Sequence, residues 1–251
     1  MAGHSKWANI KRKKARMDEK KGKLFTKLAR EISVAVKEGG ADPALNPRLS
    51  AAIQKAKAAN MPNENIERAI KKGSGGMDDV NYENVYYEGY GPGGAAVLCS
   101  ALTDNRNRTA GEIRHIFTKR GGNLGESGCV SWMFEKKGQI IVDLKETEQD
   151  EDDVLMAAID SGAEDVEAED SVVEIITLPE DFKEVKDFLE EKGIKISSAE
   201  VTMVPQNTVV INDQETAEKM LQLIEDLEDL DDVQEVYSNY DIPEDLLKNL
   251  N

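Results

Sequence analysis

The chain has 251 residues, a formal net charge of −17, 39% hydrophobic residues and 32% charged residues. Its length exceeds the usual domain size of about 100 to 200 residues, so we expect two or three domains, each with its own core. Because no apolar run approaches the roughly 20 residues that span a bilayer, and no apolar segment follows the basic start, we expect a cytoplasmic protein rather than a membrane or secreted one.

The first element is a basic arm, which we define as residues 6–16, KWANIKRKKAR. It places six cations behind a tryptophan. Residues 1–75 as a whole hold 18 Lys and Arg against 7 Asp and Glu, a net charge of +11, which leaves residues 76–251 at −28. This division predicts that one end of the chain attracts anions and that the remainder repels them.

Three helices are predicted after the basic arm. Apolar residues spaced three and four apart over 24–36 form a helical stripe that ends at a Gly-Gly pair. An alanine-rich helix follows from about Pro47 to Asn60, and a third, opened by a proline, runs from about Pro62 to Lys72. A glycine-rich linker comes next, so we expect a basic helical domain of residues 1–75.

Period-two apolar runs begin beyond the linker. The runs ENVYYEGY and AAVLCSAL are predicted strands joined across GPGG, a helix is predicted over about 110–120, and CVSWMFE is a further strand. Over residues 138–204 the elements follow in the order βαββαβ, which is the ferredoxin-like pattern. NTVVI, a helix over about 214–228 and DVQEVYSN come last and form one more βαβ half.

The two halves that flank the βαββαβ segment predict a discontinuous domain. We therefore expect an α+β protein, with an N-terminal three-helix domain followed by two ferredoxin-like α/β domains, the third inserted into the second. The expected bounds are 76–136 plus 206–245 for the second domain and 137–205 for the third. The helix over 214–228 keeps its apolar residues on one face, so we expect its acids to form a solvated outer face.

The basic arm is the first candidate site. On a helix its cations point all round the axis, so the arm has no apolar face for a core and is typical of segments that settle on phosphates. A merely solvated arm is the alternative. Trp7 and Ile10 could anchor it to the helical domain, or Trp7 could stack on an unpaired base. The candidate nucleic-acid-binding residues here are Lys6, Trp7, Lys11, Arg12, Lys13, Lys14, Arg16, Lys20, Lys21 and Lys23.

The second candidate site is TDNRNRTAGEIRHIFTKR at 103–120. Thr109 and Glu112 fit a capping box, which would begin the helix at about residue 110 and aim its free N–H groups at the loop before it. A helix N-terminus beside two arginines suits a phosphate or carboxylate. A structural loop neutralised by Asp104 is the alternative. The candidate binding residues are Arg106, Arg108, Arg114, Lys119 and Arg120.

An enzyme would need a partner for His115. Cys99 and Cys129 lie in apolar strand surroundings that offer no means of lowering a thiol pKa, so we expect buried thiols, and a structural or hydrogen-bonding histidine. The glycine-rich loops GYGPGG and GGNLGESG lack the strand-loop-helix context of a nucleotide site. No catalytic residue, metal site or cofactor is therefore expected.

Three stretches carry a family resemblance: GHSKWANIKRKKARMDEKKGKLFTKLAREI, NMPNENIERAIKKG, and GYGPGG followed by LTDNRNRTAGEIRHIFTKRGGNLGESG. Together they resemble the signatures of the YebC family, also called PmpR-like transcriptional regulators. The mitochondrial translational activator of cytochrome c oxidase subunit one is also a member. Lys13 and Lys14 stand where many members read His-Arg-Lys variants, a departure that preserves positive charge.

The resemblance implies a helical N-terminal domain and two α/β domains arranged around a cavity, with no catalytic activity. Bacterial members are commonly described as DNA-binding transcriptional regulators, whereas the mitochondrial relative and some bacterial ones act in translation on the ribosome. That includes stalls on proline-rich nascent chains.

We therefore expect a non-enzymatic, nucleic-acid-binding regulator of gene expression. Ribosomal RNA is the preferred target, because no helix-turn-helix signature supplies a base-reading helix and a remainder at −28 fits poorly along a bare duplex. Duplex DNA, bound by a transcriptional regulator, is the alternative. The acidic domains could also bind ribosomal proteins, and an enzyme that depends on His115 is a remote third possibility.

Overall fold

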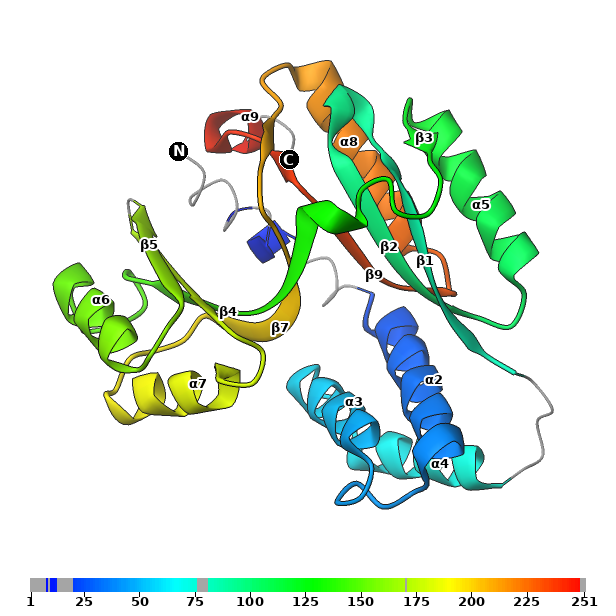
Figure 1. The fold of residues 1–251 in the computed structure, drawn as a ribbon, viewed down its shortest axis with the longest axis horizontal. Helices are drawn as coiled ribbons and strands as arrows, with labels where there is room; N and C mark the ends of the chain where they lie inside the picture. The colour runs from blue at the N-terminus through cyan, green and yellow to red at the C-terminus, as the bar shows by residue number, and fades with distance from the viewer. Residues whose placement is uncertain (1–7, 9, 13–19, 76–80, 170, 249–251) are drawn as a thin grey trace.

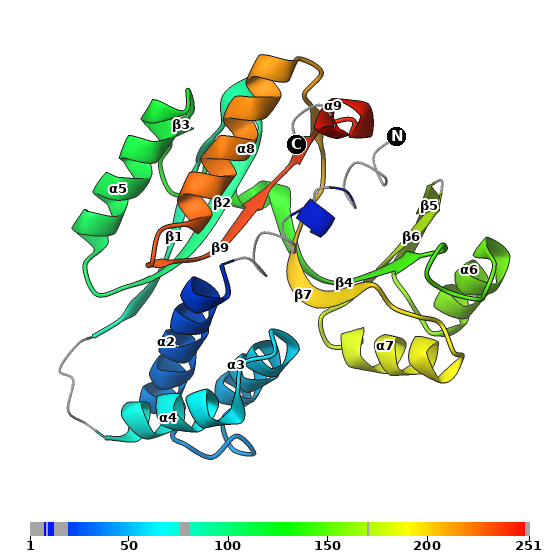
Figure 2. The same cartoon turned by 180° about the vertical axis from the view of Figure 1, so that it is seen from behind.

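Three structural units make up the computed structural model, which describes residues 8, 10–12, 20–75, 81–169 and 171–248 (Figure 1, Figure 2). A helical unit is followed by two units in which a pair of helices covers one face of a four-stranded sheet. The predicted α+β class, with N-terminal helices before antiparallel sheets, is confirmed. The residue bounds given above for the three domains stay a prediction.

The helical unit contains all three predicted helices, which are α2 (Lys21–Gly39), α3 (Pro47–Ala58) and α4 (Asn63–Ser74). α2 is followed by Gly40, whose φ of 87° lies in the left-handed region that glycine adopts without strain. The side chain of Asn46 caps α3 by accepting a hydrogen bond from the Leu49 amide at 3.0 Å, and Pro47 takes the first helical position. Local sequence signals therefore set these helix ends.

The core of the helical unit lies between α2 and its two neighbours. Leu28, Ile32 and Leu49 are at most 2% exposed and share one cluster with alanines of α3 and α4. α2 and α4 approach closely, because a Cβ atom built on Gly73 would lie 2.6 Å from the carbonyl oxygen of Ser33. This close crossing makes the seam between the two helices narrow and well packed.

The second unit is built on a sheet in the order β3-β1-β2-β9, with antiparallel neighbours throughout. Helices α5 and α8 cover one face, where Phe117, Met220 and Leu223 are fully buried. The two central strands form a hairpin, so the connectivity of this sheet differs from the ferredoxin-like order. The elements are β1 (Glu83–Tyr90), β2 (Ala96–Thr103), α5 (Arg106–Lys119), β3 (Asn123–Leu124), α8 (Gln214–Glu228) and β9 (Val233–Ser238).

The segment NTVVI does not join this sheet, which corrects the predicted βαβ half. Its strand β8 (Val209–Val210) pairs in parallel with β10 (Tyr240–Asp241), and the short helix α9 (Glu244–Lys248) follows. Two residues are too few for a sequence pattern to reveal such a bridge. Within the part of the chain that the structure describes, every helix is too short or too polar to span a bilayer.

The third unit is the predicted βαββαβ segment. Its sheet has the order β5-β6-β4-β7 with antiparallel neighbours, which is the ferredoxin-like arrangement. Ile140, Ile175 and Leu189 are fully buried between the sheet and its helices. The elements are β4 (Phe134–Asp143), α6 (Glu151–Asp160), β5 (Asp165–Glu169), β6 (Val172–Thr177), α7 (Phe182–Glu191) and β7 (Ser198–Pro205).

The predicted strand over residues 129–135 is wrong, because most of that segment forms a loop and a short 3-10 turn before β4 begins at Phe134. The carboxylate of Glu88, 4% exposed, accepts hydrogen bonds from the amides of Gly128, Val130 and Ser131 at 2.8 to 2.9 Å. These amides bind a side chain rather than a neighbouring strand. Burial alone would raise the pKa of Glu88, but the three amide hydrogen bonds outweigh it and lower that pKa.

Replacing Glu88 by glutamine is expected to lower the free energy of unfolding at pH 7 by about 2 kcal/mol. The glutamine amide has one neutral acceptor oxygen in place of two charged ones, so it cannot satisfy all three N–H donors and forms weaker hydrogen bonds with those it does accept from. A carboxylate whose pKa falls on folding stabilises the protein above its unfolded pKa of about 4.3 and loses that contribution as the pH falls further. Urea unfolding of wild type and Glu88→Gln should therefore differ at pH 7 and converge near pH 3.

The matched control is Glu126→Gln in the same loop, where Glu126 is exposed. It should change the stability by less than about 0.5 kcal/mol. An equal loss in both variants, or a difference between wild type and Glu88→Gln that persists unchanged at pH 3, would contradict this account of the loop.

Candidate nucleic-acid interface

The structure describes ten of the fifteen predicted binding residues. Those described are Lys11, Arg12, Lys20, Lys21, Lys23, Arg106, Arg108, Arg114, Lys119 and Arg120. Those that lie outside the described residues are Lys6, Trp7, Lys13, Lys14 and Arg16.

The described part of the basic arm lies between the second and third units rather than on the helical unit (Figure 1). Ile10 packs against Ile141 and Val172 of the third unit, and Ala8 packs against the core of the second. The sequence suggested that Ile10 could anchor the arm to the three-helix unit. In the structure it packs against the third unit instead. A guanidinium nitrogen of Arg12 reaches Glu225 Oε1 of α8 at 3.3 Å.

A basic stripe continues from the arm along one side of α2, and we define it as Lys20, Lys23, Lys27 and Arg30. Their spacing of three, four and three residues places all of them on one face of the helix. They face the acidic end of α8, which we define as Glu225, Glu228, Asp229, Asp231 and Asp232.

The basic stripe donates hydrogen bonds to both carboxylates and main-chain carbonyls at the acidic end of α8. Lys20 Nζ lies 2.6 Å from Asp229 Oδ2, Lys27 donates to the Glu228 carbonyl at 2.6 Å, and Arg30 donates to the Asp231 carbonyl at 2.9 Å. Cations are favoured at a helix C-terminus, where these carbonyls have no partner within the helix. The acids of α8 are therefore only partly the solvated outer face that we predicted.

Burial accompanies this contact. It lowers the pKa of Lys27, and the nearby Glu228 carboxylate opposes that effect. Lys55 of α3 extends the contact by pairing with Glu235 at 2.6 Å, and for this amine the attraction of Glu235 and Glu31 outweighs burial and raises the pKa. The helical unit is therefore held to the second unit largely by ion pairs and charge-assisted hydrogen bonds.

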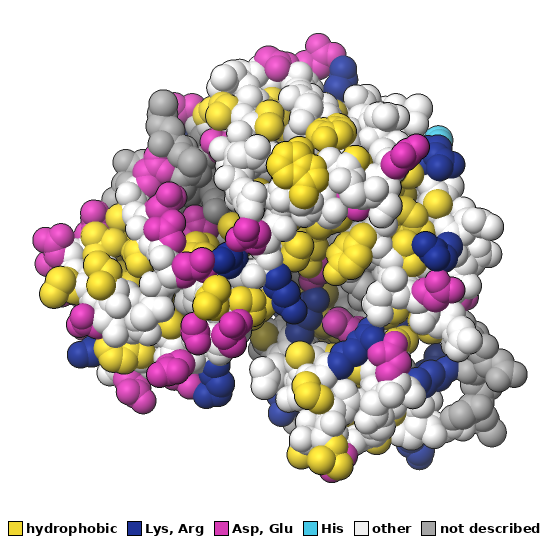
Figure 3. Space-filling view, in the orientation of Figure 1, with side chains coloured by type: hydrophobic (Ala, Val, Ile, Leu, Met, Phe, Trp, Pro, Cys, Tyr) yellow, Lys and Arg dark blue, Asp and Glu magenta, His cyan; other side chains and the backbone are white. Residues whose placement is uncertain are grey.

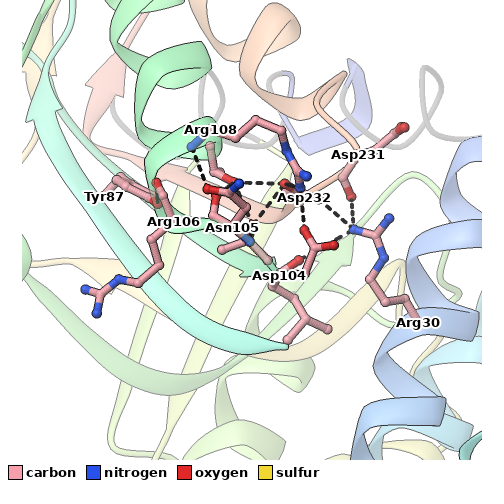
Figure 4. A network of polar contacts seen from close by, with 11 residues as sticks. Arg30, Tyr87, Asp104, Asn105, Arg106, Arg108, Asp231 and Asp232 are labelled. Carbon is pink, nitrogen blue, oxygen red and sulfur yellow. Dashed lines mark hydrogen bonds and ion pairs between the residues drawn. The ribbon is translucent and has the colours of Figure 1, made fainter. Parts of the chain in front are cut away.

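Asp232 is the centre of a polar network that joins Arg30 of the basic stripe to the second candidate site (Figure 4). Its side chain, 9% exposed, accepts from Arg108 at 2.6 Å, Thr109 at 2.8 Å, Thr103 at 3.1 Å and Arg30 at 2.9 Å. Burial alone would raise the pKa of Asp232, but the hydrogen bonds from Arg108 and the two threonines outweigh it and lower that pKa. The network therefore keeps a buried carboxylate charged.

Helix α5 begins earlier than the predicted start at about residue 110. The helix begins at Arg106, because the side chain of Asn105 accepts from the amide of Arg108 at 3.1 Å and so provides the N-cap. Thr109 does not cap the helix, since its hydroxyl is buried against Asp232. Arg106 and Arg108 therefore lie in the first turn of α5 rather than in the preceding loop.

The environment of Arg108 matches the alternative named for this segment, a structural loop neutralised by Asp104. In addition to Asp232, Arg108 binds Asp104 Oδ1 at 2.7 Å. Arg120 is also engaged, with Asp226 at 2.7 Å. Arg106 is more available, since its side chain is 65% exposed and its closest carboxylate oxygen, on Glu83, lies 3.7 Å away. Of the cations predicted at 103–120, Arg108 and Arg120 thus bind carboxylates in this structure, and whether the others bind an anion stays a prediction.

Arg114 and Lys119 are exposed on α5, with no ion pair to any residue in the described ranges. They belong to the second unit and do not form one surface with the basic stripe, which lies on α2 of the helical unit. In the space-filling view, Lys and Arg are visible where the three units meet, whereas Asp and Glu are spread over the unit that contains α6 and α7 (Figure 3).

Sequence reasoning missed Lys27 and Arg30, as well as the acids that bind the stripe. One signal was present, because Lys20, Lys23, Lys27 and Arg30 recur at helical spacing. That signal does not reveal the partner, since the two charged faces are about 200 residues apart in the chain.

The described residues offer little for catalysis. We expected a structural or hydrogen-bonding histidine, but His115 is exposed on α5 and makes no hydrogen bond to another described side chain. Burial raises the pKa of both thiols, Cys99 and Cys129, which makes neither a ready nucleophile. No group of three or more His, Cys, Asp or Glu side chains within the described ranges is arranged to hold a metal ion.

Comparisons with known proteins cover nearly the whole chain. Residues 5–76 match the TACO1/YebC protein N-terminal domain, and residues 82–240 match the TACO1/YebC second and third domain. A probable transcriptional regulatory protein of Halothermothrix orenii is 60% identical over 250 residues, which cover 100% of this chain and 99% of that protein. A protein of the same description from Dictyoglomus turgidum is 59% identical, with 100% of both chains covered.

A solved structure agrees with these matches. The crystal structure of a conserved hypothetical protein from Aquifex aeolicus has a TM-score of 0.76 and 56% sequence identity to this chain. The match covers 92% of this chain and 94% of that one. The two family models, the full-length relatives and this structure together show that the chain belongs to the TACO1/YebC family.

Proposed function

We propose that this protein is a non-enzymatic regulator of gene expression that binds nucleic acid through its basic arm and the basic stripe of α2. The observation that carries the proposal is that the stripe donates hydrogen bonds to carboxylates and main-chain carbonyls at the acidic end of α8. A phosphate backbone presents a comparable row of anionic oxygens, so the same cations suit a polyanion. The names of the relatives, probable transcriptional regulatory proteins, support a regulatory role.

Binding would be competitive within the molecule. Each cation of the stripe that contacts a phosphate must first leave an oxygen at the acidic end of α8, or share its donors with it. Exposed ion pairs such as Lys20 with Asp229 are worth at most about 1 kcal/mol and weaken in salt, so the exchange is inexpensive there, whereas Arg30 stays bound to the nearly buried Asp232. The acidic end of α8 therefore weakens binding and makes it selective for a dense polyanion.

Duplex DNA is the first candidate target, because the relatives are named transcriptional regulators. Ribosomal RNA is the second candidate. The charge of −28 on residues 76–251 favours it, because such a surface is better accommodated facing outward from a ribosomal groove than along a bare duplex.

Two assays on the full chain separate the targets: retardation of a 30-base-pair duplex in a gel, and sedimentation of lysate through a low-salt sucrose gradient with and without nuclease. We expect the protein to retard the duplex and to stay at the top of the gradient. Co-sedimentation with ribosomal fractions that nuclease abolishes, together with no retardation of the duplex, would instead establish the translational role.

A further inference from the structure

A pocket of about 450 Å³ is lined by residues of α2 and α4 beside their seam, and it shares Arg30 with the face of α2 that meets α8. Arg30, Lys37, Arg68 and Lys72 line it, with the aromatic rings of Phe25 and Tyr82. None of the described residues that line it is Asp or Glu, although the chain has a formal net charge of −17. Four cations and no described carboxylate therefore line the pocket itself, with Arg30 paired to Asp232 outside the lining.

The walls of the pocket are fixed by packing. The Ser33 hydroxyl donates to the carbonyl of Ala69 at 2.8 Å, which ties α2 to α4 beside the pocket. The backbone of Gly73 meets α2 so closely that a Cβ there would lie 2.7 Å from the Val36 Cβ. A cavity formed by such a close helix crossing keeps its shape when a ligand enters, which reduces the entropic cost of binding.

Tyr82 is held in place by the network that Asp232 organises. The guanidinium carbon of Arg30 lies 5.4 Å from the centre of the Tyr82 ring, within the range of a cation–π contact. Arg30 is itself fixed by Asp232 at 2.9 Å and by the Asp231 carbonyl at 2.9 Å. The cation–π contact thus fixes the Tyr82 ring where it lines the pocket, and the exposed Arg68 lines the pocket from α4.

We propose that this pocket holds one unpaired nucleotide of a single-stranded nucleic acid, with the base against Phe25 and Tyr82 and the phosphate beside Arg68. The inference rests on the proposed function and adds a preference to it. A pocket of this volume is within the range of about 300 to 1,000 Å³ for small-ligand sites. Aromatic rings beside cations bind unpaired bases of any sequence, whereas bases stacked inside a duplex cannot enter.

The test is fluorescence anisotropy of the full chain with three labelled probes at 100 mM KCl: a 12-nucleotide oligouridine, a 12-nucleotide oligothymidine and a blunt duplex of 12 base pairs. We expect Arg68→Glu and Tyr82→Leu to weaken binding of the single strands at least about 10-fold and binding of the duplex less than about 3-fold. Tyr82→Phe keeps the ring and should restore single-strand binding. The two single strands show whether the pocket prefers RNA or DNA.

Lys71→Glu is the matched charge control, because Lys71 is exposed on α4 and does not line the pocket. It should weaken single-strand binding less than about 3-fold. Uridine monophosphate should displace the oligouridine only at millimolar concentration. Displacement at micromolar concentration would assign the pocket to a free nucleotide and overturn the proposal.

The proposal is also overturned if wild type binds single strands and both Arg68→Glu and Tyr82→Leu bind them equally well. The proposed function would then stand, with the basic arm and stripe as the binding surface. If wild type binds none of the three probes, the proposed function itself fails. Far-ultraviolet circular dichroism and thermal unfolding of each variant show that lost binding does not come from lost folding.

Discussion

Replacing Asp232 by alanine is expected to lower the free energy of unfolding by about 3 kcal/mol. The carboxylate is nearly buried and accepts from Arg30, Thr103, Arg108 and Thr109, so its loss removes one acceptor from four donors and the nearest counter-charge from two guanidinium groups. Removal of one partner from a buried ionic network costs more than the pairs contribute, because the remaining charge stays desolvated. Urea unfolding at pH 7, followed by circular dichroism, measures the loss.

Asp104→Ala is the matched control for this network. Asp104 also binds Arg108, at 2.7 Å, but its side chain is 36% exposed. This variant should cost less than about 1 kcal/mol, as exposed ion pairs do. If Asp232→Ala is no more destabilising than Asp104→Ala, Asp232 is not the junction that holds the helical unit to the second unit.

The network also predicts acid sensitivity. Because the pKa of Asp232 is lowered on folding, its stabilising contribution is present above the unfolded value of about 3.9 and is lost as the pH falls through the folded value. The difference between wild type and Asp232→Ala should therefore be constant from pH 5 to 7 and shrink below pH 4.

Reversing the charge of the basic arm is expected to weaken nucleic-acid binding at least about 100-fold at 100 mM salt. The arm-reversal variant carries Lys11→Glu, Arg12→Glu, Lys13→Glu and Lys14→Glu. It loses four phosphate-binding charges and adds four that repel phosphates, and binding of this kind is dominated by such charges. Anisotropy titrations of a 30-base-pair duplex and of a structured RNA of similar length measure the change.

The control has the same change in net charge at another place. Lys183, Lys186, Lys192 and Lys195 are on or just after α7, and their reversal to glutamate should change affinity less than about 5-fold. If this variant loses as much affinity as the arm-reversal variant, binding depends on total charge rather than on the arm. If neither loses affinity, the arm is not the binding surface.

Much of the fold could be predicted from local patterns. β1 spans the eight residues that its alternation marked, and α8 runs from Gln214 to Glu228 as its apolar stripe indicated. Two of the errors share a cause, which is a carboxylate that binds groups distant in the sequence. Glu88 keeps residues 128–131 out of a sheet, and Asp232 draws Thr109 away from capping α5.

The site was harder to predict than the fold. Charge division identified a basic N-terminal region and predicted a polyanionic partner for it, but the acidic end of α8 is itself an anionic partner. Lys20 and Asp229 are separated by 209 residues, so only the folded chain reveals that they pair. The pocket between α2 and α4 was missed for the same reason, because Arg68 and Tyr82 come together only when the helices cross.

The central claim is that the N-terminal cations contact phosphates, and the salt dependence of binding tests it most directly. The full chain should be titrated with a 30-base-pair duplex and with the structured RNA from 50 to 300 mM KCl. If the six cations of residues 6–16 each neutralise about one phosphate, log K should fall against log[KCl] with a slope of about −5 on the duplex, and less steeply on single-stranded RNA. A slope shallower than about −1 on both, or no binding at 50 mM KCl, would contradict the account.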